Sequence, residues 1–230
     1  MIKIENTEVY GWKAAIRGMR NSYNSWDKSD SYETHIENPQ TLNTAPFEFF
    51  IGDNDLALMK KLVKSGSDHS KFMRMITVTC DITAPLYWWK EADTYKVGTV
   101  RNSCSTMHKI VDKAFTLDDF SHEHLKPTVL DGTLHSGCKS TLEKVIDVLN
   151  TMRIQYLSTK DKFYWWQMIQ LLPSSYNQRA TVQMNYEVLR NMYHSRKNHR
   201  LDEWVEFCKW IETLPYSELI TGGNENGTQA

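Results

Sequence analysis

Two polar stretches of the chain combine cations, amides and hydroxyl groups at spacings that suit the binding of a small anionic ligand. The first follows an aromatic segment, and its clustered donors can grip a phosphate or the polar edge of a planar cofactor. Gly98 allows the backbone to approach a ligand closely. An ordinary solvated segment fits the same pattern. The candidate donors are Thr94, Tyr95, Lys96, Thr99, Arg101, Asn102 and Ser103.

The second polar stretch begins at Asn185, where a predicted strand ends, and continues along a predicted helix that carries Asn191 and Arg196. Neutral amides can read the carbonyl and imide groups of a ring, and an arginine adds a two-pronged grip on an anion. The alternative is a basic helix face that is simply solvated. We expect the two stretches to fold together around one cleft.

Two further groups of residues give weaker signals. His122 and His124 would share a face on a strand, but no third ligand stands at a useful spacing, so surface histidines are favoured and no metal site is predicted. Cys104 could act as a nucleophile beside His108 if that segment were helical. A buried structural cysteine is the favoured interpretation.

Composition and charge restrict the class of protein. The 230 residues suit one domain, predicted over residues 1–220, with a polar, glycine-rich and disordered tail over 221–230. The net charge of -1 argues against duplex nucleic acid as a partner, although small anions need only a few placed cations. Four cysteines without a CxxC pair favour the reducing cytoplasm. We find no signal peptide and no apolar run long enough for a membrane helix.

Periodicity predicts a mixture of helices and strands. Residues 75–83 alternate between apolar and hydroxyl-bearing side chains, which predicts a strand with one packed face, and 180–186 predict another. Pro85 suits the first turn of a helix. No regular alternation of strands and helices and no GxGxxG turn supports a dinucleotide-binding fold. Further helices are predicted over 54–65 (capped by Asp53 or Asn54), 140–157 (with a Ser140–Glu143 capping box), 162–172, 187–196 and 201–213.

Two blocks of the sequence together resemble the flavin-dependent thymidylate synthases. The first runs from residue 58 to residue 107 and contains Ala84-Pro85-Leu86, where that family has Ala-Pro and an apolar residue. The second runs from 171 to 204 and keeps the family's Leu-Pro, strand, Asn, Leu-x-Asn and downstream Arg. The matching positions in the second block are Leu172, Pro173, Asn185, Leu189, Asn191 and Arg196.

The first block departs from the signature of that family. Its Arg-His-Arg becomes Thr94-Tyr95-Lys96, its first Ser becomes Thr99, and its Asn becomes Arg101. The second Ser falls on Cys104, the final Arg-Tyr on Thr106-Met107, and the arginine that precedes Leu-Pro falls near Ile169. The chain therefore resembles a divergent member in which Lys96 and Arg101 are candidates to replace the lost cations.

The resemblance implies an α+β fold, with a small, mostly antiparallel sheet packed by several helices in a single domain. It implies FAD as cofactor, held by Asn185, Asn191, Lys96, Thr94, Tyr95 and Asn102. It implies dUMP as substrate, contacted by Thr99, Arg101, Ser103, Cys104 and Arg196, with Arg196 favouring the ionised base.

The reaction implied by the resemblance is methylation of dUMP to dTMP, with methylene-tetrahydrofolate as carbon donor, reduced FAD as hydride donor and NADPH as reductant. The family is a homotetramer with active sites at subunit interfaces. Two alternatives remain open: a changed chemistry on a pyrimidine nucleotide, and a module that binds flavin or nucleotide without catalysis.

Overall fold

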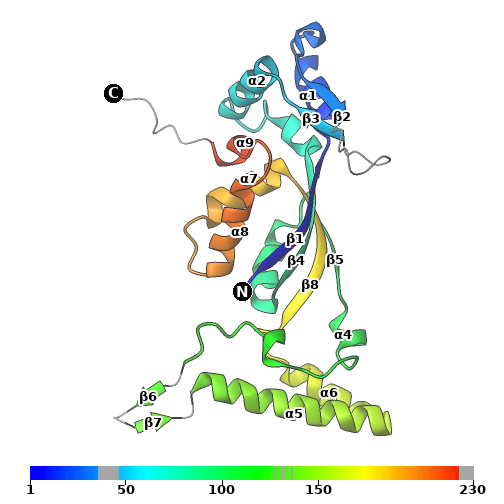
Figure 1. Cartoon of the computed structure of the whole chain (residues 1–230), viewed down its shortest axis with the longest axis vertical. Helices are drawn as coiled ribbons and strands as arrows, with labels where there is room; N and C mark the ends of the chain where they lie inside the picture. Colours follow the sequence, from blue (N-terminus) through cyan, green and yellow to red (C-terminus); the bar gives the residue numbers. More distant parts are fainter. Residues whose placement is uncertain (36–46, 127, 131–132, 136, 223–230) are drawn as a thin grey trace.

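A four-stranded antiparallel sheet runs along the middle of the protein (Figure 1). The computed structural model describes residues 1–35, 47–126, 128–130, 133–135 and 137–222. In spatial order the strands are β1 (Lys3–Tyr10), β4 (Thr77–Pro85), β8 (Asn177–Asn185) and β5 (Val100–Ser103). The α+β class and the mostly antiparallel sheet predicted from the sequence are confirmed.

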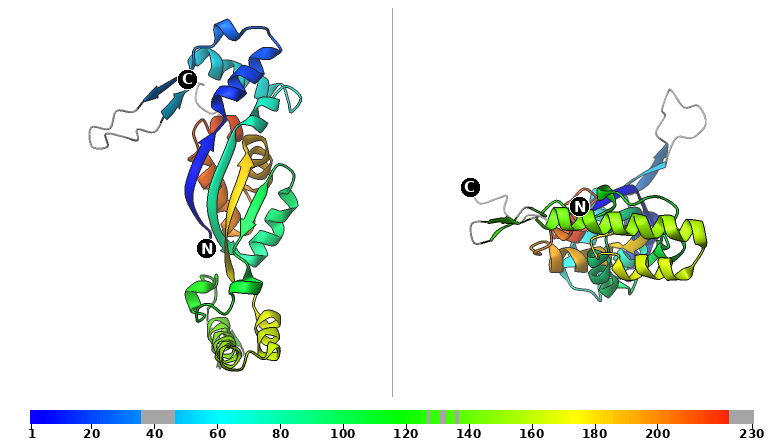
Figure 2. Two further views of the ribbon diagram at one scale, coloured as in Figure 1. Left: turned by 90° about the vertical axis from the view of Figure 1, so that its right-hand side faces the viewer. Right: turned by 90° about the horizontal axis from the view of Figure 1, so that it is seen from below.

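The alternation in β4 gives the sheet one dry face and one polar face. Val78, Cys80 and Ile82 are buried on the face that the helices cover. On the other face the Asp81 carboxylate accepts hydrogen bonds from Thr181, Asn6 and Arg179, which lower the pKa of Asp81. Figure 2 shows this second face with no helix over it in the described part of the chain. The prediction of a sheet with one packed face is therefore confirmed.

Three helices cover the dry face: α3 (Leu86–Ala92), α7 (Tyr186–Arg196) and α8 (Asp202–Glu212). Their contact is largely aromatic, because the ring centroids of Trp88 and Trp204 lie 4.9 Å apart and those of Trp204 and Phe207 5.6 Å apart. Pro85 is the last residue of β4 and precedes α3, close to the predicted break.

Shorter elements gather at one end of the sheet. They are α1 (Trp12–Asn21), α2 (Asp53–Lys64), α9 (Glu218–Thr221) and the 3₁₀ turns η1 (Trp26–Lys28) and η2 (Lys71–Met75). A hairpin of β2 (Tyr32–His35) and β3 (Phe47–Phe50) projects from this end (Figure 2). Gly11 joins β1 to α1 with a φ of 97°, and a Cβ there would lie 2.0 Å from the carbonyl oxygen of Met75. No other residue fits this junction without displacing the backbone of η2.

A buried carboxylate ties the loop after α1 to α2. Asp55 is fully buried and accepts hydrogen bonds from Arg20 Nε at 2.6 Å and from the Ser29 and Ser31 hydroxyls at 2.7 Å. Asp30 of the same loop accepts from the backbone N–H groups of Asn54 and Asp55. The predicted cap of α2 by Asp53 or Asn54 is therefore wrong. The helix begins at Asp53, and a loop carboxylate satisfies its first donors.

The opposite end of the sheet carries a second hydrophobic core. It lies under α5 (Cys138–Thr159) and α6 (Lys162–Leu171) and contains Phe115, Phe120 and Leu149. The Ser140–Glu143 capping box is wrong, because α5 already begins at Cys138, and Ser140 Oγ instead donates to the Gly137 carbonyl. The remaining elements at this end are α4 (Thr106–Lys109), η4 (Leu117–Asp119), β6 (Thr128–Leu130) and β7 (Thr133–His135).

The sequence-based domain limits stay a prediction. Thr221, the first residue of the predicted tail, ends α9, and residues 223–230 lie outside the described part of the chain. Within the described ranges, no helix is both long and apolar enough to cross a membrane.

We predict that replacing Asp55 by alanine lowers the free energy of unfolding by about 3–5 kcal/mol, because Arg20 then keeps a buried charge without a partner. Denaturant unfolding measures this loss. Asp27→Ala is the matched control, because Asp27 is exposed and its side chain forms no hydrogen bond or ion pair within the described chain. Equal losses in both variants would show that the Asp55 network contributes little.

The same carboxylate predicts how stability depends on acid. Burial alone would raise the pKa of Asp55, but hydrogen bonds from Ser31, Ser29 and Arg20 outweigh it and lower that pKa. A lowered pKa in the folded state gives stability that is present above the unfolded pKa of about 3.9 and is lost as pH falls through the folded value. We expect Asp55→Asn to lose less stability than wild type between about pH 5 and pH 2. Parallel acid-unfolding profiles for the two proteins would contradict this.

Candidate functional site

Antiparallel pairing of β4 with β8 brings the ends of two helices together. Pro85 pairs with Asn177 and Thr77 with Asn185, so α3 and α7 leave the sheet at opposite ends. Nine-residue strands span roughly 30 Å, whereas α7 and the segment from α3 through η3 (Asp93–Tyr95) each span about 15 Å. Because both helices run back along the covered face, their C-terminal ends meet near its middle. The α7 helix lies against this face in Figure 1.

Arg196 marks the meeting point. Its Nε donates to the hydroxyl of Tyr95 at 2.9 Å, and its Nη1 donates to Glu91 Oε2 at 2.9 Å. The guanidinium carbon lies 4.9 Å from the ring centroid of Trp204, and the Trp204 indole N–H also donates to Glu91. Nη1 lies 2.9 Å from His199 Nε2 as well. The side chain of Arg196 is 19% exposed and is held on several sides. Its Nη2 has no hydrogen-bond partner in the described chain.

A second contact between the two stretches joins Asn185 to Gly98. Asn185 Oδ1 accepts a hydrogen bond from the Val188 N–H at 3.0 Å, so this side chain caps α7. Gly98 has a φ of 78°, and a Cβ there would lie 3.0 Å from Asn185 Nδ2. The stretches around 94–103 and 185–196 therefore lie together, whereas the expected cleft between them stays a prediction, because the cavity beside Arg101 is lined by none of Asn185, Asn191 and Arg196. The binding roles given to their residues stay predictions.

A small cavity of about 70 Å³ opens behind the first stretch. Lys96, Thr99 and Arg101 line it together with side chains of the aromatic core. Arg101 forms an ion pair with Asp93 at 2.9 Å, and its guanidinium carbon lies 4.8 Å from the Trp89 ring centroid. Thr99 Oγ1 donates to the Tyr95 carbonyl. Pockets for drug-sized ligands hold about 300–1,000 Å³, so this cavity alone cannot enclose a flavin.

Other predicted site residues lie outside this cavity. Asn102 pairs with Thr181 on the open face of the sheet, so its side chain points away from Arg101, whereas Ser103 pairs with Ala180 on the covered face. Cys104 lines a separate cavity of about 460 Å³ near the start of β8. Thr94 Oγ1 donates to the Glu91 carbonyl. Asn191 is exposed on α7, and its side chain forms no hydrogen bond within the described chain.

Sequence reasoning missed Glu91 and Trp204 as neighbours of Arg196. Glu91 stands four residues before Tyr95, on the same side of the helical segment, which could have shown that both face one partner. Trp204 gave no local signal, because only the packing of α8 on α7 brings it to the guanidinium.

The weaker candidates stay apart from this site. His124 Nε2 lies 3.0 Å from Asp202, and His122 Nδ1 lies 2.8 Å from the Phe120 carbonyl. Among the described residues, no group of three potential ligands could hold a metal ion. Cys104 is exposed, so the expectation of a buried structural cysteine is wrong. It precedes α4, so the helical spacing that would pair it with His108 does not occur.

Among comparisons with known proteins, only the comparison of structures finds relatives, and it identifies the fold. No protein-family model matches the chain, and no curated protein sequence matches it. Among solved structures, thymidylate synthase X from Helicobacter pylori with FAD and dUMP has a TM-score of 0.63 at 13% identity, covering 96% of this chain and 97% of that chain. The UMP/dUMP methylase PolB from Streptomyces cacaoi with 5-Br dUMP has a TM-score of 0.59 at 15% identity, covering 96% and 95%. The fold that the sequence resemblance implied is therefore confirmed.

Proposed function

We propose that the protein is a flavin-dependent enzyme that methylates C5 of dUMP to give dTMP. Methylene-tetrahydrofolate would donate the carbon, and NADPH would reduce FAD. The observation that carries the proposal is the contact of Arg196 with Tyr95, which joins the two ligand-binding stretches on a fold shared with enzymes solved with dUMP or its analogue.

The donors around this contact fit a flavin in chemistry. Asn191 and Lys96 are exposed, and their side chains form no hydrogen bond or ion pair within the described chain. The amide of Asn191 suits a ring imide, and the ammonium of Lys96 suits a phosphate. Gly98 packs closely against Asn185, because a Cβ there would lie 3.0 Å from Asn185 Nδ2, so the two stretches approach each other tightly at this point. When bound, reduced FAD supplies the hydride that converts the transferred methylene into a methyl group.

Arg196 would act on the pyrimidine itself. Glu91 and Tyr95 fix two of its nitrogens, so Nη2 has a defined direction for a carbonyl oxygen of the base. A fixed positive charge at that oxygen stabilises the ionised base, whose C5 is the better nucleophile. Glu91 thus serves as a positioning residue that orients Arg196.

The altered signature leaves few cations for the nucleotide phosphate. Arg101 is paired with Asp93 and Arg196 with Glu91, whereas Lys96 forms no ion pair within the described chain. We assign the FAD phosphate to Lys96 and the nucleotide phosphate to Arg101, which would turn from Asp93 when the phosphate arrives. UMP is the second acceptor to test, because PolB is a UMP/dUMP methylase.

A second subunit would supply the wall that one chain lacks. The helix α6 exposes Phe163 (58%), Trp166 (43%) and Leu171 (41%). Exposed aromatic residues in such number are typical of an interface. We therefore propose a homotetramer in which this face of α6 is buried and the flavin lies between subunits.

We predict that Arg196→Gln lowers the rate of dTMP formation by about 100-fold, because a charged donor to the base is lost. Tritium release from 5-tritiated dUMP, with methylene-tetrahydrofolate, NADPH and FAD, measures the rate, and 5-tritiated UMP tests the ribonucleotide. Arg200→Gln is the matched control, since Arg200 is exposed and its side chain forms no hydrogen bond or ion pair within the described chain. We expect it to keep the wild-type rate.

Two results would contradict the proposed activity. Wild-type protein that gains no flavin absorbance after FAD addition and gel filtration would exclude the cofactor. Flavin and dUMP binding without tritium release from either nucleotide would instead favour the non-catalytic module.

We predict that Trp166→Glu reduces the assembly from a tetramer to smaller species, because a charge cannot be buried without a partner at an apolar interface. Light scattering during gel filtration measures the mass against 26.9 kDa for one chain. Gln170→Glu adds the same charge to an exposed polar position of α6 and serves as control. A wild-type protein that runs as a monomer would contradict the interface.

A further inference from the structure

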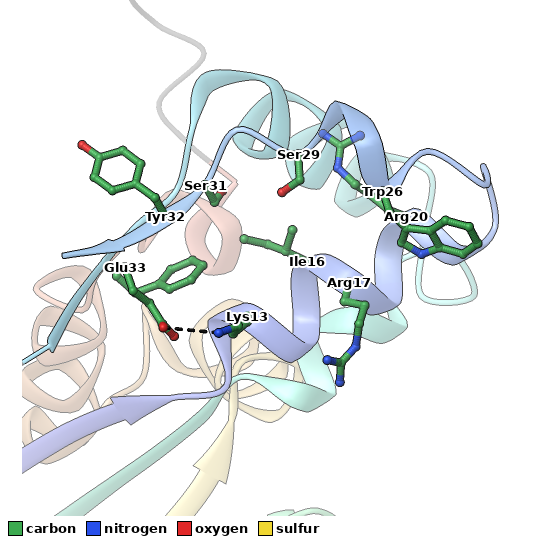
Figure 3. A pocket seen from close by; sticks show the side chains of 10 residues that line it. Lys13, Ile16, Arg17, Arg20, Trp26, Ser29, Ser31, Tyr32 and Glu33 are labelled. Carbon is green, nitrogen blue, oxygen red and sulfur yellow. Dashed lines mark hydrogen bonds and ion pairs between the residues drawn. The ribbon is translucent and has the colours of Figure 1, made fainter.

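A second cavity lies between α1, η1 and the base of the β2–β3 hairpin (Figure 3). Its volume is about 350 Å³, and it shares no lining residue with the small cavity beside Arg101. A volume of this size suits a small organic molecule. Nothing in the proposed methylation uses this cavity.

Aromatic side chains form the two ends of this cavity. Trp26 is 51% exposed, yet its indole N–H donates to Asn21 Oδ1 at 2.8 Å, which fixes the direction of the ring. Tyr32 is 60% exposed, and its ring stacks on Phe50 with centroids 5.5 Å apart. Figure 3 places Trp26 at one end and Tyr32 at the other, with Ile16 pointing into the space between them. Exposed rings held in fixed orientations suit the stacking of a planar molecule.

The back wall of the cavity is rigid. Ser29, Ser31 and Arg20 line it, and all three are tied to the buried carboxylate of Asp55. Ile16 is only 4% exposed. A wall that is ordered before the ligand arrives reduces the entropy lost on binding.

The charges around the cavity leave one cation in excess. Arg20 is neutralised by Asp55, and Lys13 forms an ion pair with Glu33 at 3.3 Å. Arg17 lines the cavity and forms no ion pair within the described chain. In Figure 3, Arg17 leaves α1 between Lys13 and the end that holds Trp26, and its guanidinium points away from Ile16. Arg17 is therefore the lining cation that is left to attract an anion to the mouth of the cavity.

We propose that this cavity binds a flat aromatic molecule that carries an anionic group. The ring packs on Ile16 and against Trp26, and the anion pairs with Arg17 through a charged hydrogen bond. The anionic group has two possible sources, the phosphate of a nucleotide and the carboxylate of a folate-like molecule. Both share the same recognition chemistry, so the experiment separates them.

The test uses full-length protein labelled with 5-fluorotryptophan, in which fluorine NMR gives one signal for each of the 8 tryptophans. Trp26→Phe identifies the Trp26 signal. The probes are dUMP and 5-formyltetrahydrofolate, each compared with an uncharged counterpart, deoxyuridine or pterin. We expect the Trp26 signal to shift with at least one charged probe and not with its uncharged counterpart.

Arg17→Gln should weaken this binding about tenfold, the effect of losing one charged hydrogen bond. Lys28→Gln removes an exposed cation from the adjoining turn η1, which does not line the cavity, and should leave binding unchanged. A shift with dUMP alone supports the phosphate, and a shift with the formylfolate alone supports the carboxylate.

Three outcomes would overturn the proposal: no movement of the Trp26 signal with either charged probe, equal binding of charged and uncharged probes, or equal effects of the two cation variants. The readout needs neither FAD nor turnover. It therefore stays informative in Arg196→Gln protein and if the proposed methylation fails.

Discussion

Antiparallel pairing between β4 and β8 is the constraint on which the rest of the structure depends. Pro85 and Asn177 pair at one end of the ladder although 92 residues separate them in the sequence. Only the ladder from Thr77–Asn185 to Pro85–Asn177 holds the two strands in register. Because side chains alternate between faces, a slip by one residue would move Val182 and Met184 from the core to solvent. The same slip would shift α7 along the sheet and separate Arg196 from Tyr95.

The charges of Arg101 and Arg196 near the meeting point are balanced within the chain. Asp93 pairs with Arg101, and Glu91 pairs with Arg196. Pairing removes the cost of holding cations together before a ligand binds, and it also weakens the attraction for a doubly charged phosphate. Tyr95 stands where the family has histidine, and it supplies an oxygen that accepts from Arg196. The site is therefore ordered by contacts within the chain.

The sequence predicted what local patterns control. The alternation in 75–83 identified β4 and its packed face, and helical spacing identified α2, α6, α7 and α8 within a few residues. The caps of α2 and α5 were wrong, because Asp30 reaches α2 from another segment and Gly137 precedes α5. Asn102 was grouped with Arg101 by proximity in the chain, although neighbouring strand residues face opposite ways. The cavity at α1 gave no sequence signal, because its walls come from separate elements.

The hydrophobic core under α5 and α6 is separate from the core between the sheet and its helices. Phe115, Phe120 and Leu149 pack with one another and belong to a different cluster from the residues between the sheet and α7. Segments with separate cores open as separate cooperative units, each with its own free energy of local unfolding. The segment of α5 and α6 can therefore lose and regain its structure while the sheet keeps Arg196 and Tyr95 in place.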